Sequence, residues 1–149
     1  MAGAQQQLDG FLAKFSPEVD SLATAVLAKL RRRLPGATIM VYDNYNALAI
    51  GFGSSDKVSR AALSLAVYPR WVNLFFLQAK GLSDPQGLLK GEGGKVRHVR
   101  LDGPDAIEDP AIEALIAQAV ARSDPPFDAE ATERLVIKSV SAKQRPRRR

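Results

Sequence analysis

The chain has 149 residues, 46% of them hydrophobic, and contains no cysteine. A chain of this length can bury roughly 68–70% of the surface that it exposes when unfolded, so a single domain is stable without a disulfide or a metal. The lack of cysteine excludes a thiol nucleophile, a thiolate metal site and a disulfide framework.

The formal net charge of +5 comes from one end of the chain. Removing the five basic residues of the C-terminal segment from the 21 in the chain leaves 16, which balance the 16 acidic residues. We therefore predict a single domain over residues 1–140 and a basic, disordered tail over 141–149 that detaches without loss of stability. Such a tail would associate weakly and non-specifically with nucleic acid through Lys143, Arg145, Arg147, Arg148 and Arg149.

The N-terminal residues MAGAQQQLDG lack the basic and apolar regions of a secretory signal. No apolar run approaches the roughly 20 residues of a membrane span. The expected location is cytoplasmic, without membrane contact.

Two amphipathic helices are predicted in the first part of the chain. Residues 8–15 carry apolar side chains at three- and four-residue spacing. The second helix begins at Ser16, which can cap it, and ends before Pro35-Gly36. Its last turn, Arg31 to Arg33, is either a solvated end matched to the helix dipole or a phosphate-binding patch, and we favour the former.

Alternating apolar residues then predict about five strands, mainly antiparallel because their connections are short. The predicted strands cover 37–42, 47–52, 63–67, 72–76 and 96–101. A further helix is predicted from Asp109 to Arg122, and 135–140 is prone to form a strand. The glycine-rich segment 81–94 is a mobile connection or a flap that closes over a ligand, and it lacks the Walker A pattern.

Few residues carry a signature of catalysis. His98 is the only histidine, and no serine stands in a G-x-S-x-G elbow, so the chain leans away from an enzyme. Asp102, Asp105, Glu108 and Asp109 form a weak candidate metal site, because hard cations prefer oxygen ligands. Acidic residues before a helix also have a sufficient reason to be there without metal, and no cofactor is predicted.

Aromatic and polar residues gather at the ends of the two predicted hairpins. Tyr and Trp combine a flat contact area with a hydrogen-bonding group, which is typical of a recognition surface. The alternative is that these rings complete the core at the end of the sheet. The candidate ligand-binding residues are Tyr42, Asp43, Tyr45, Asn46, Tyr68, Arg70 and Trp71, with Lys90 from the glycine-rich segment.

From residue 8 to 120 the order of these segments resembles the YdhG-like family, a mainly bacterial family of unknown function. The resemblance rests on the proline-flanked helix SPEVDSLATAVLAKLRRRLPGA, Tyr42, Val67-Tyr68-Pro69 and GGKVRHVRLD. It implies an α+β fold with a mostly antiparallel sheet and helices on one face, similar to frataxin. Some members are described as iron chaperones, so iron carriage is an alternative function. The chain departs from the family after Tyr42, where Asp43-Asn44-Tyr45 replaces Gly-Met-Pro.

The sequence thus favours a small binding module with a pocket for a small molecule or a protein partner at the aromatic sheet end. The alternatives are an iron chaperone and weak nucleic-acid association through the basic tail.

Overall fold

Two helices open the chain, as predicted: the second begins and ends where its capping residues indicate, whereas the first begins four residues earlier and ends two residues earlier than the predicted range 8–15. In the computed structural model, which describes residues 3–148, α1 (Ala4–Ala13) is followed directly by α2 (Pro17–Arg33). The Ser16 hydroxyl accepts a hydrogen bond from the backbone N–H of Val19 and so caps α2. At the other end, Arg31 pairs with Glu133 and Arg33 with Glu113, so these two arginines hold other elements to α2.

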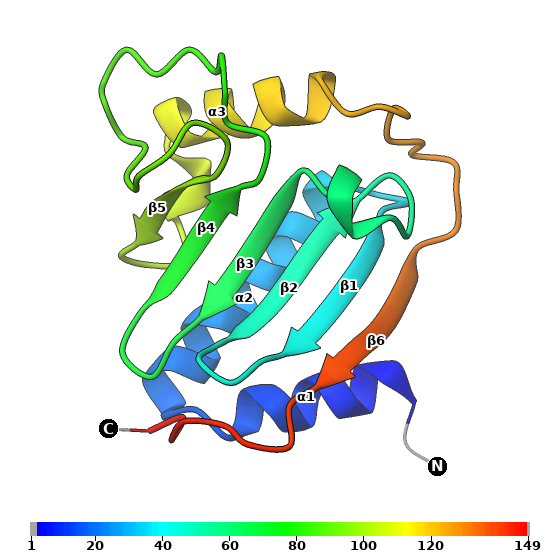
Figure 1. Ribbon diagram of the computed structural model, residues 1–149, viewed down its shortest axis with the longest axis vertical. Helices are drawn as coiled ribbons and strands as arrows, with labels where there is room; N and C mark the ends of the chain where they lie inside the picture. Colours follow the sequence, from blue (N-terminus) through cyan, green and yellow to red (C-terminus); the bar gives the residue numbers. More distant parts are fainter. Residues whose placement is uncertain (1–2, 149) are drawn as a thin grey trace.

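Six strands form one sheet in the order β5-β4-β3-β2-β1-β6 (Figure 1). The bounds are β1 (Thr38–Asp43), β2 (Leu48–Gly53), β3 (Leu63–Val67), β4 (Val72–Phe76), β5 (Arg97–Leu101) and β6 (Arg134–Val140). Neighbours from β1 to β5 are antiparallel. The prediction of an α+β fold with a mostly antiparallel sheet is confirmed.

The sixth strand corrects the predicted count of about five. The chain leaves α3 (Pro110–Ala121), runs along one side of the molecule and enters β6 parallel to β1 (Figure 1). Gly36, with φ of 78°, permits this path, because a Cβ there would lie 2.1 Å from the carbonyl oxygen of Asp128. A strand paired with one that lies about 100 residues earlier leaves no local hairpin signal in the sequence.

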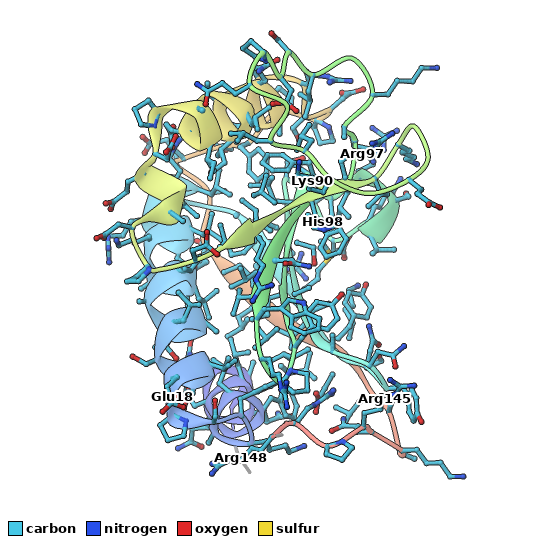
Figure 2. All side chains as sticks on the ribbon, turned by 90° about the vertical axis from the view of Figure 1, so that its left-hand side faces the viewer. Glu18, Lys90, Arg97, His98, Arg145 and Arg148 are labelled. Atoms are coloured by element: carbon cyan, nitrogen blue, oxygen red, sulfur yellow. The ribbon has the colours of Figure 1, made fainter. Side chains whose placement is uncertain are left out.

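The helices pack against one face of the sheet and leave the other face without a helical layer (Figures 1 and 2). Alternate residues of the central strands, such as Ile50, Leu65 and Leu74, are fully buried against the helices. The opposite face carries smaller side chains, including Ala49, Ser64 and Ala66, which pair across β2, β3 and β4. We call this second surface the open face.

Residues 141–148 differ from the expected disordered tail. They continue from β6 beneath the sheet and run beside α1 (Figure 1). Arg147 is 5% exposed, and its Nη2 lies 2.9 Å from Oδ1 of Asp43, which is fully buried. A buried carboxylate at the end of β1 requires a counter-charge, and the tail supplies it.

The glycine-rich segment is tied to its surroundings. The Asp84 carboxylate accepts hydrogen bonds from the backbone N–H groups of Leu88 and Leu89, and Gln118 of α3 bonds the backbone of Ser83 in both directions. Further along, the backbones of Lys90 and His98 exchange two hydrogen bonds. These contacts give the segment a fixed course above β4 and β5.

Within residues 3–148, none of the helices combines the length and apolar character needed to cross a bilayer.

Candidate functional site: an aromatic and cationic pocket at the hairpin ends

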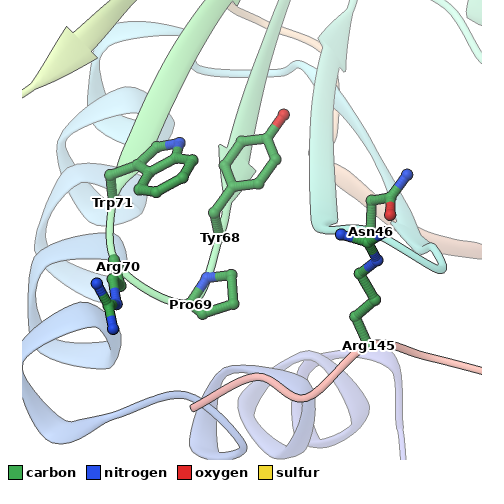
Figure 3. Close-up of a pocket in the computed structure, with 6 residues that line it drawn as sticks. All are labelled: Asn46, Tyr68, Pro69, Arg70, Trp71 and Arg145. Carbon is green, nitrogen blue, oxygen red and sulfur yellow. The ribbon is translucent and has the colours of Figure 1, made fainter. Parts of the chain in front are cut away.

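A cavity of about 420 Å³ lies where two hairpin turns and the C-terminal segment meet (Figure 3). Its volume is within the range of small-molecule sites. We call this cavity the hairpin pocket. Three separate parts of the chain line it: Asn46 from the β1–β2 turn, Tyr68, Pro69, Arg70 and Trp71 from the β3–β4 turn, and Arg145 from the C-terminal segment.

An aromatic pair forms one wall of the hairpin pocket. The turn closes with a hydrogen bond from the backbone N–H of Tyr68 to the carbonyl oxygen of Trp71, 2.9 Å long. Their rings stack with centroids 5.4 Å apart and an angle of 26° between the planes. Trp71 remains 38% exposed, so its ring does not simply complete the core. This exposure supports a recognition surface over the alternative of core packing.

Cations surround this wall. The guanidinium of Arg100 lies 5.5 Å from the centroid of the Trp71 ring. Arg70 is exposed and forms no ion pair within the described chain. Arg145 is also exposed, and Figure 3 shows its side chain reaching toward Asn46. Because none of the described lining residues is acidic, the pocket offers positive charge without a competing internal anion.

Burial raises the pKa of the Tyr68 phenol above its ordinary value of 10.0. The cause is desolvation, which disfavours the charged phenolate. The phenol is therefore neutral at physiological pH and can donate a hydrogen bond to a ligand oxygen.

A second, shallower hollow extends the pocket over the open face. It has a volume of about 510 Å³ and shares Asn46 and Tyr68 with the hairpin pocket. It is lined by small side chains of β2 and β3 and by the ring of Phe75. The centroid of the Phe75 ring lies 5.0 Å from that of the His98 ring. Asn73 lies on this face two residues after Trp71, and its buried Oδ1 has no hydrogen-bond partner in the described chain. An unused acceptor therefore lies beside the aromatic wall.

The position of Arg145 depends on a buried anchor two residues later in the chain. Arg147 Nη2 bonds both the Asp43 carboxylate and the carbonyl oxygen of Asn44, at 2.9 and 2.6 Å. Its guanidinium also lies 5.5 Å from the Phe15 ring centroid. Nearer the pocket, the backbone N–H of Arg145 bonds the carbonyl oxygen of Tyr45 at 2.9 Å. These contacts fix the C-terminal segment against the β1–β2 turn.

The structure separates the predicted ligand-binding residues into three groups. Asn46, Tyr68, Arg70 and Trp71 do come together in the hairpin pocket, and Tyr45 lines the adjoining hollow. Tyr42 is half-buried in β1 and Asp43 is buried in its ion pair, so neither lines the hairpin pocket.

Lys90 lies far from the other predicted ligand-binding residues. It sits at the upper end of the sheet, whereas Arg145 marks the lower end (Figure 2). The glycine-rich segment is at this upper end too, so a flap that closes over the hairpin pocket receives no support.

Three of the four acidic residues proposed as a weak metal site have other partners. Lys29 of α2 lies 2.8 Å from a carboxylate oxygen of Asp105 and 3.1 Å from one of Glu108. The hydrogen bond with Asp105 raises the pKa of Lys29. Asp109 accepts a hydrogen bond from the backbone N–H of Ala111 and caps α3. Asp102 is exposed, and no group of three metal-ligating side chains occurs in residues 3–148.

The basic residues proposed to contact nucleic acid are not equivalent. Arg147 is buried, and Arg148 donates hydrogen bonds to the carbonyl oxygens of Lys14 and Ala13. Lys143 and Arg145 are exposed, and Arg149 lies outside the described residues. Nucleic-acid association through the tail stays a prediction.

Sequence reasoning missed two features of the site. It placed Arg145 in a detached tail, and it did not identify Arg100 as a neighbour of Trp71. The alternation of residues along β5 could have indicated the contact of Arg100 with Trp71. It places Arg100 on the open face, where Arg100 pairs with Asn73 in the sheet register. Comparison of the chain with protein-family models, curated proteins and solved structures gives no match.

Proposed function

We propose that the protein is a small binding module that takes a small molecule into the hairpin pocket. The observation that carries this proposal is the partly exposed Trp71, stacked on Tyr68 at the wall of a cavity of about 420 Å³. Large, rigid aromatic surfaces next to a few polar groups characterise ligand sites. The arrangement supplies contact area and orients a ligand, and a binding role is sufficient to account for it.

We retain the likeness to the YdhG-like family, and with it a cytoplasmic location, as part of this proposal. The function of the family is unknown, which is compatible with a binding role. The iron-carrying alternative has less support, because Lys29 already engages Asp105 and Glu108. Ferrous-iron titration is expected to show no stoichiometric binding.

Trp71 is the only tryptophan, so its indole N–H gives a unique resonance in isotope-labelled protein. A fragment library that contains neutral, anionic and cationic rings should include members that shift this resonance in a saturable manner. Trp71→Ala should weaken their binding about tenfold or more without unfolding the protein, because the side chain contributes contact area and is partly exposed.

The matched control is Val58→Ala, which removes an exposed apolar side chain from the 3-10 helix η1 (Val58–Arg60), outside the lining of the hairpin pocket. This variant should bind the fragments like the wild type. If no fragment of any charge perturbs Trp71, the pocket is not a binding site and the proposal is wrong.

A further inference from the structure

Building on the proposed binding role, we infer that the hairpin pocket takes a planar aromatic anion and that the C-terminal segment completes the site. The ring of such a ligand would contact Trp71 and Tyr68. Its carboxylate or phosphate would meet the guanidinium groups of Arg70 and Arg145. The ligand class thus follows from the joint presence of an aromatic wall and arginines that lack an acidic partner.

The aromatic wall favours a flat ring over an aliphatic chain. Trp71 and Tyr68 are already held in a stacked arrangement by a turn with a backbone hydrogen bond. A wall that is fixed before binding loses little side-chain entropy when a ligand arrives. Stacking on such a surface adds to the binding free energy when the rings meet in an offset or edge-on arrangement.

The charges at the pocket favour an anion. Arg70 and Arg145 both line the cavity, and Arg100 lies over Trp71. Neither Arg70 nor Arg145 forms an ion pair with a carboxylate in residues 3–148, whereas Arg31, Arg33 and Arg147 do. The guanidinium of Arg145 lies 5.7 Å from the Tyr45 ring centroid, which leaves its N–H donors without a carboxylate partner. Arginine presents planar donors that match carboxylate and phosphate oxygens, so these two guanidinium groups suit either one.

The nearby acid does not cancel this positive charge. Asp43 is buried below the β1–β2 turn, where Arg147 at 2.9 Å and Lys14 at 3.4 Å pair with its two carboxylate oxygens. The carboxylate is therefore neutralised before a ligand binds. An anion at the pocket meets the arginines without facing an uncompensated Asp43.

The C-terminal segment contributes Arg145 to the pocket through this same ion pair. Asp43 holds Arg147, and the backbone of Arg145 is bonded to Tyr45, so the segment crosses the β1–β2 turn in one course. Releasing Arg147 would free Arg145 from the pocket while leaving Tyr68, Arg70 and Trp71 in the sheet. Arg147 is thus a positioning residue for the anion site.

The test compares anions with neutral counterparts of the same ring. Two pairs of probes suffice: AMP with adenosine, and indoleacetate with tryptophol, each titrated while the Trp71 indole resonance is followed. In at least one pair the anion should bind about tenfold or more tightly than the neutral probe, since a hydrogen bond to a charged group has about this effect. Added salt should lower the affinity for the anion and leave the affinity for the neutral probe unchanged.

Three variants with the same change of charge locate the effect. Arg70→Gln and Arg145→Gln should each lower the affinity for the preferred anion about tenfold and leave the neutral probe unaffected. Arg32→Gln is the matched control, because Arg32 is exposed near the end of α2 and does not line the hairpin pocket. It should bind both probes like the wild type.

Arg147→Met tests the role of the C-terminal segment. It should reduce anion affinity as much as Arg145→Gln does, with little change for the neutral probe. Where this variant fails to fold, Asp43→Asn combined with Arg147→Met removes the unpaired buried charge and should show the same selective loss. An unchanged anion affinity in a folded variant would contradict the positioning role.

The outcomes separate this inference from the proposed function. If fragments bind at Trp71 but neither anion is preferred over its neutral counterpart, the function stands and the ligand class is wrong. Loss of affinity for both probes in Arg70→Gln and Arg145→Gln would also overturn the anion site. If a short single-stranded oligoadenylate bound more than a hundredfold tighter than AMP, the pocket would belong to a nucleic-acid surface instead of a small-molecule site.

Discussion

Arg147 and Asp43 are the only charged residues that are buried within the described chain. A charge that leaves water must find a partner, and these two meet through a hydrogen bond of 2.9 Å. Arg147 Nε has no hydrogen-bond partner in residues 3–148, so the arginine is incompletely satisfied despite its contacts. The stability of this end of the molecule therefore depends on both members being present.

Arg147→Ala should reduce the free energy of unfolding by about 3 kcal/mol, near the lower end of the range for breaking a buried pair. The lower end applies because Lys14 still contacts Asp43. Denaturant unfolding measures this loss, and Arg148→Ala is the control, since Arg148 is exposed and should cost less than about 1 kcal/mol. A loss equal to that of the control would mean that the pair is not a structural anchor.

The phenol of Tyr68 makes stability depend on alkaline pH. Because burial raises its pKa in the folded state, the neutral phenol stabilises the protein fully below about pH 10, the unfolded value. This contribution is lost as the pH rises from there through the folded pKa. Tyr68→Phe should lose less stability than the wild type between about pH 9 and pH 11 in denaturant unfolding. Parallel curves for the two proteins would show that Tyr68 is not desolvated.

At the scale of elements, α2 packs against the central strands β3 and β4 and contributes to the core. Its apolar stripe is buried against the sheet, while Arg31 and Arg33 at its end pair with Glu133 and Glu113. The apolar periodicity, the Ser16 cap and the Pro35-Gly36 stop predicted its location. The ion pairs could not be predicted, because their acids lie about 80 and 100 residues further along the chain.

Leu27→Ala should destabilise the protein by about 2–5 kcal/mol, the usual cost of a cavity at a buried leucine. Leu27 belongs to the core and is 4% exposed. Denaturant unfolding gives the value, and Thr24→Ala on the same helix serves as a control that changes a more exposed side chain. A loss below about 0.5 kcal/mol would place Leu27 outside the core.

At the scale of the whole molecule, the chain closes on itself. The segment after α3 passes Gly36, adds β6 beside β1, and returns beneath the sheet to the β1–β2 turn (Figure 1). The end of the chain thus covers the acid that its first strand buries. This closure also brings Arg145 to the hairpin pocket, so stability and the candidate site share the same contacts.

Truncation after Ala142 should lower the melting temperature by roughly 10 °C, because it removes Arg147 and leaves Asp43 buried with Lys14 alone. The charge distribution of the sequence predicts no change, so this experiment decides between a detached tail and a docked one. Differential scanning calorimetry provides the measurement. An unchanged melting temperature would mean that the segment is detached.

The sequence by itself determined the helices, five of the strands and four lining residues of the hairpin pocket. Each of these follows from local information: the periods of apolar residues, the caps at Ser16 and Asp109, and the Tyr68–Trp71 turn. Only the tertiary structure decided the parallel pairing of β6, the burial of Asp43 and the entry of Arg145 into the pocket. The physical reason is distance along the chain, because Arg147 pairs with Asp43 across 104 residues. In the sequence Arg147 looks like part of a solvated tail, whereas in the fold it is buried as the partner of a buried carboxylate.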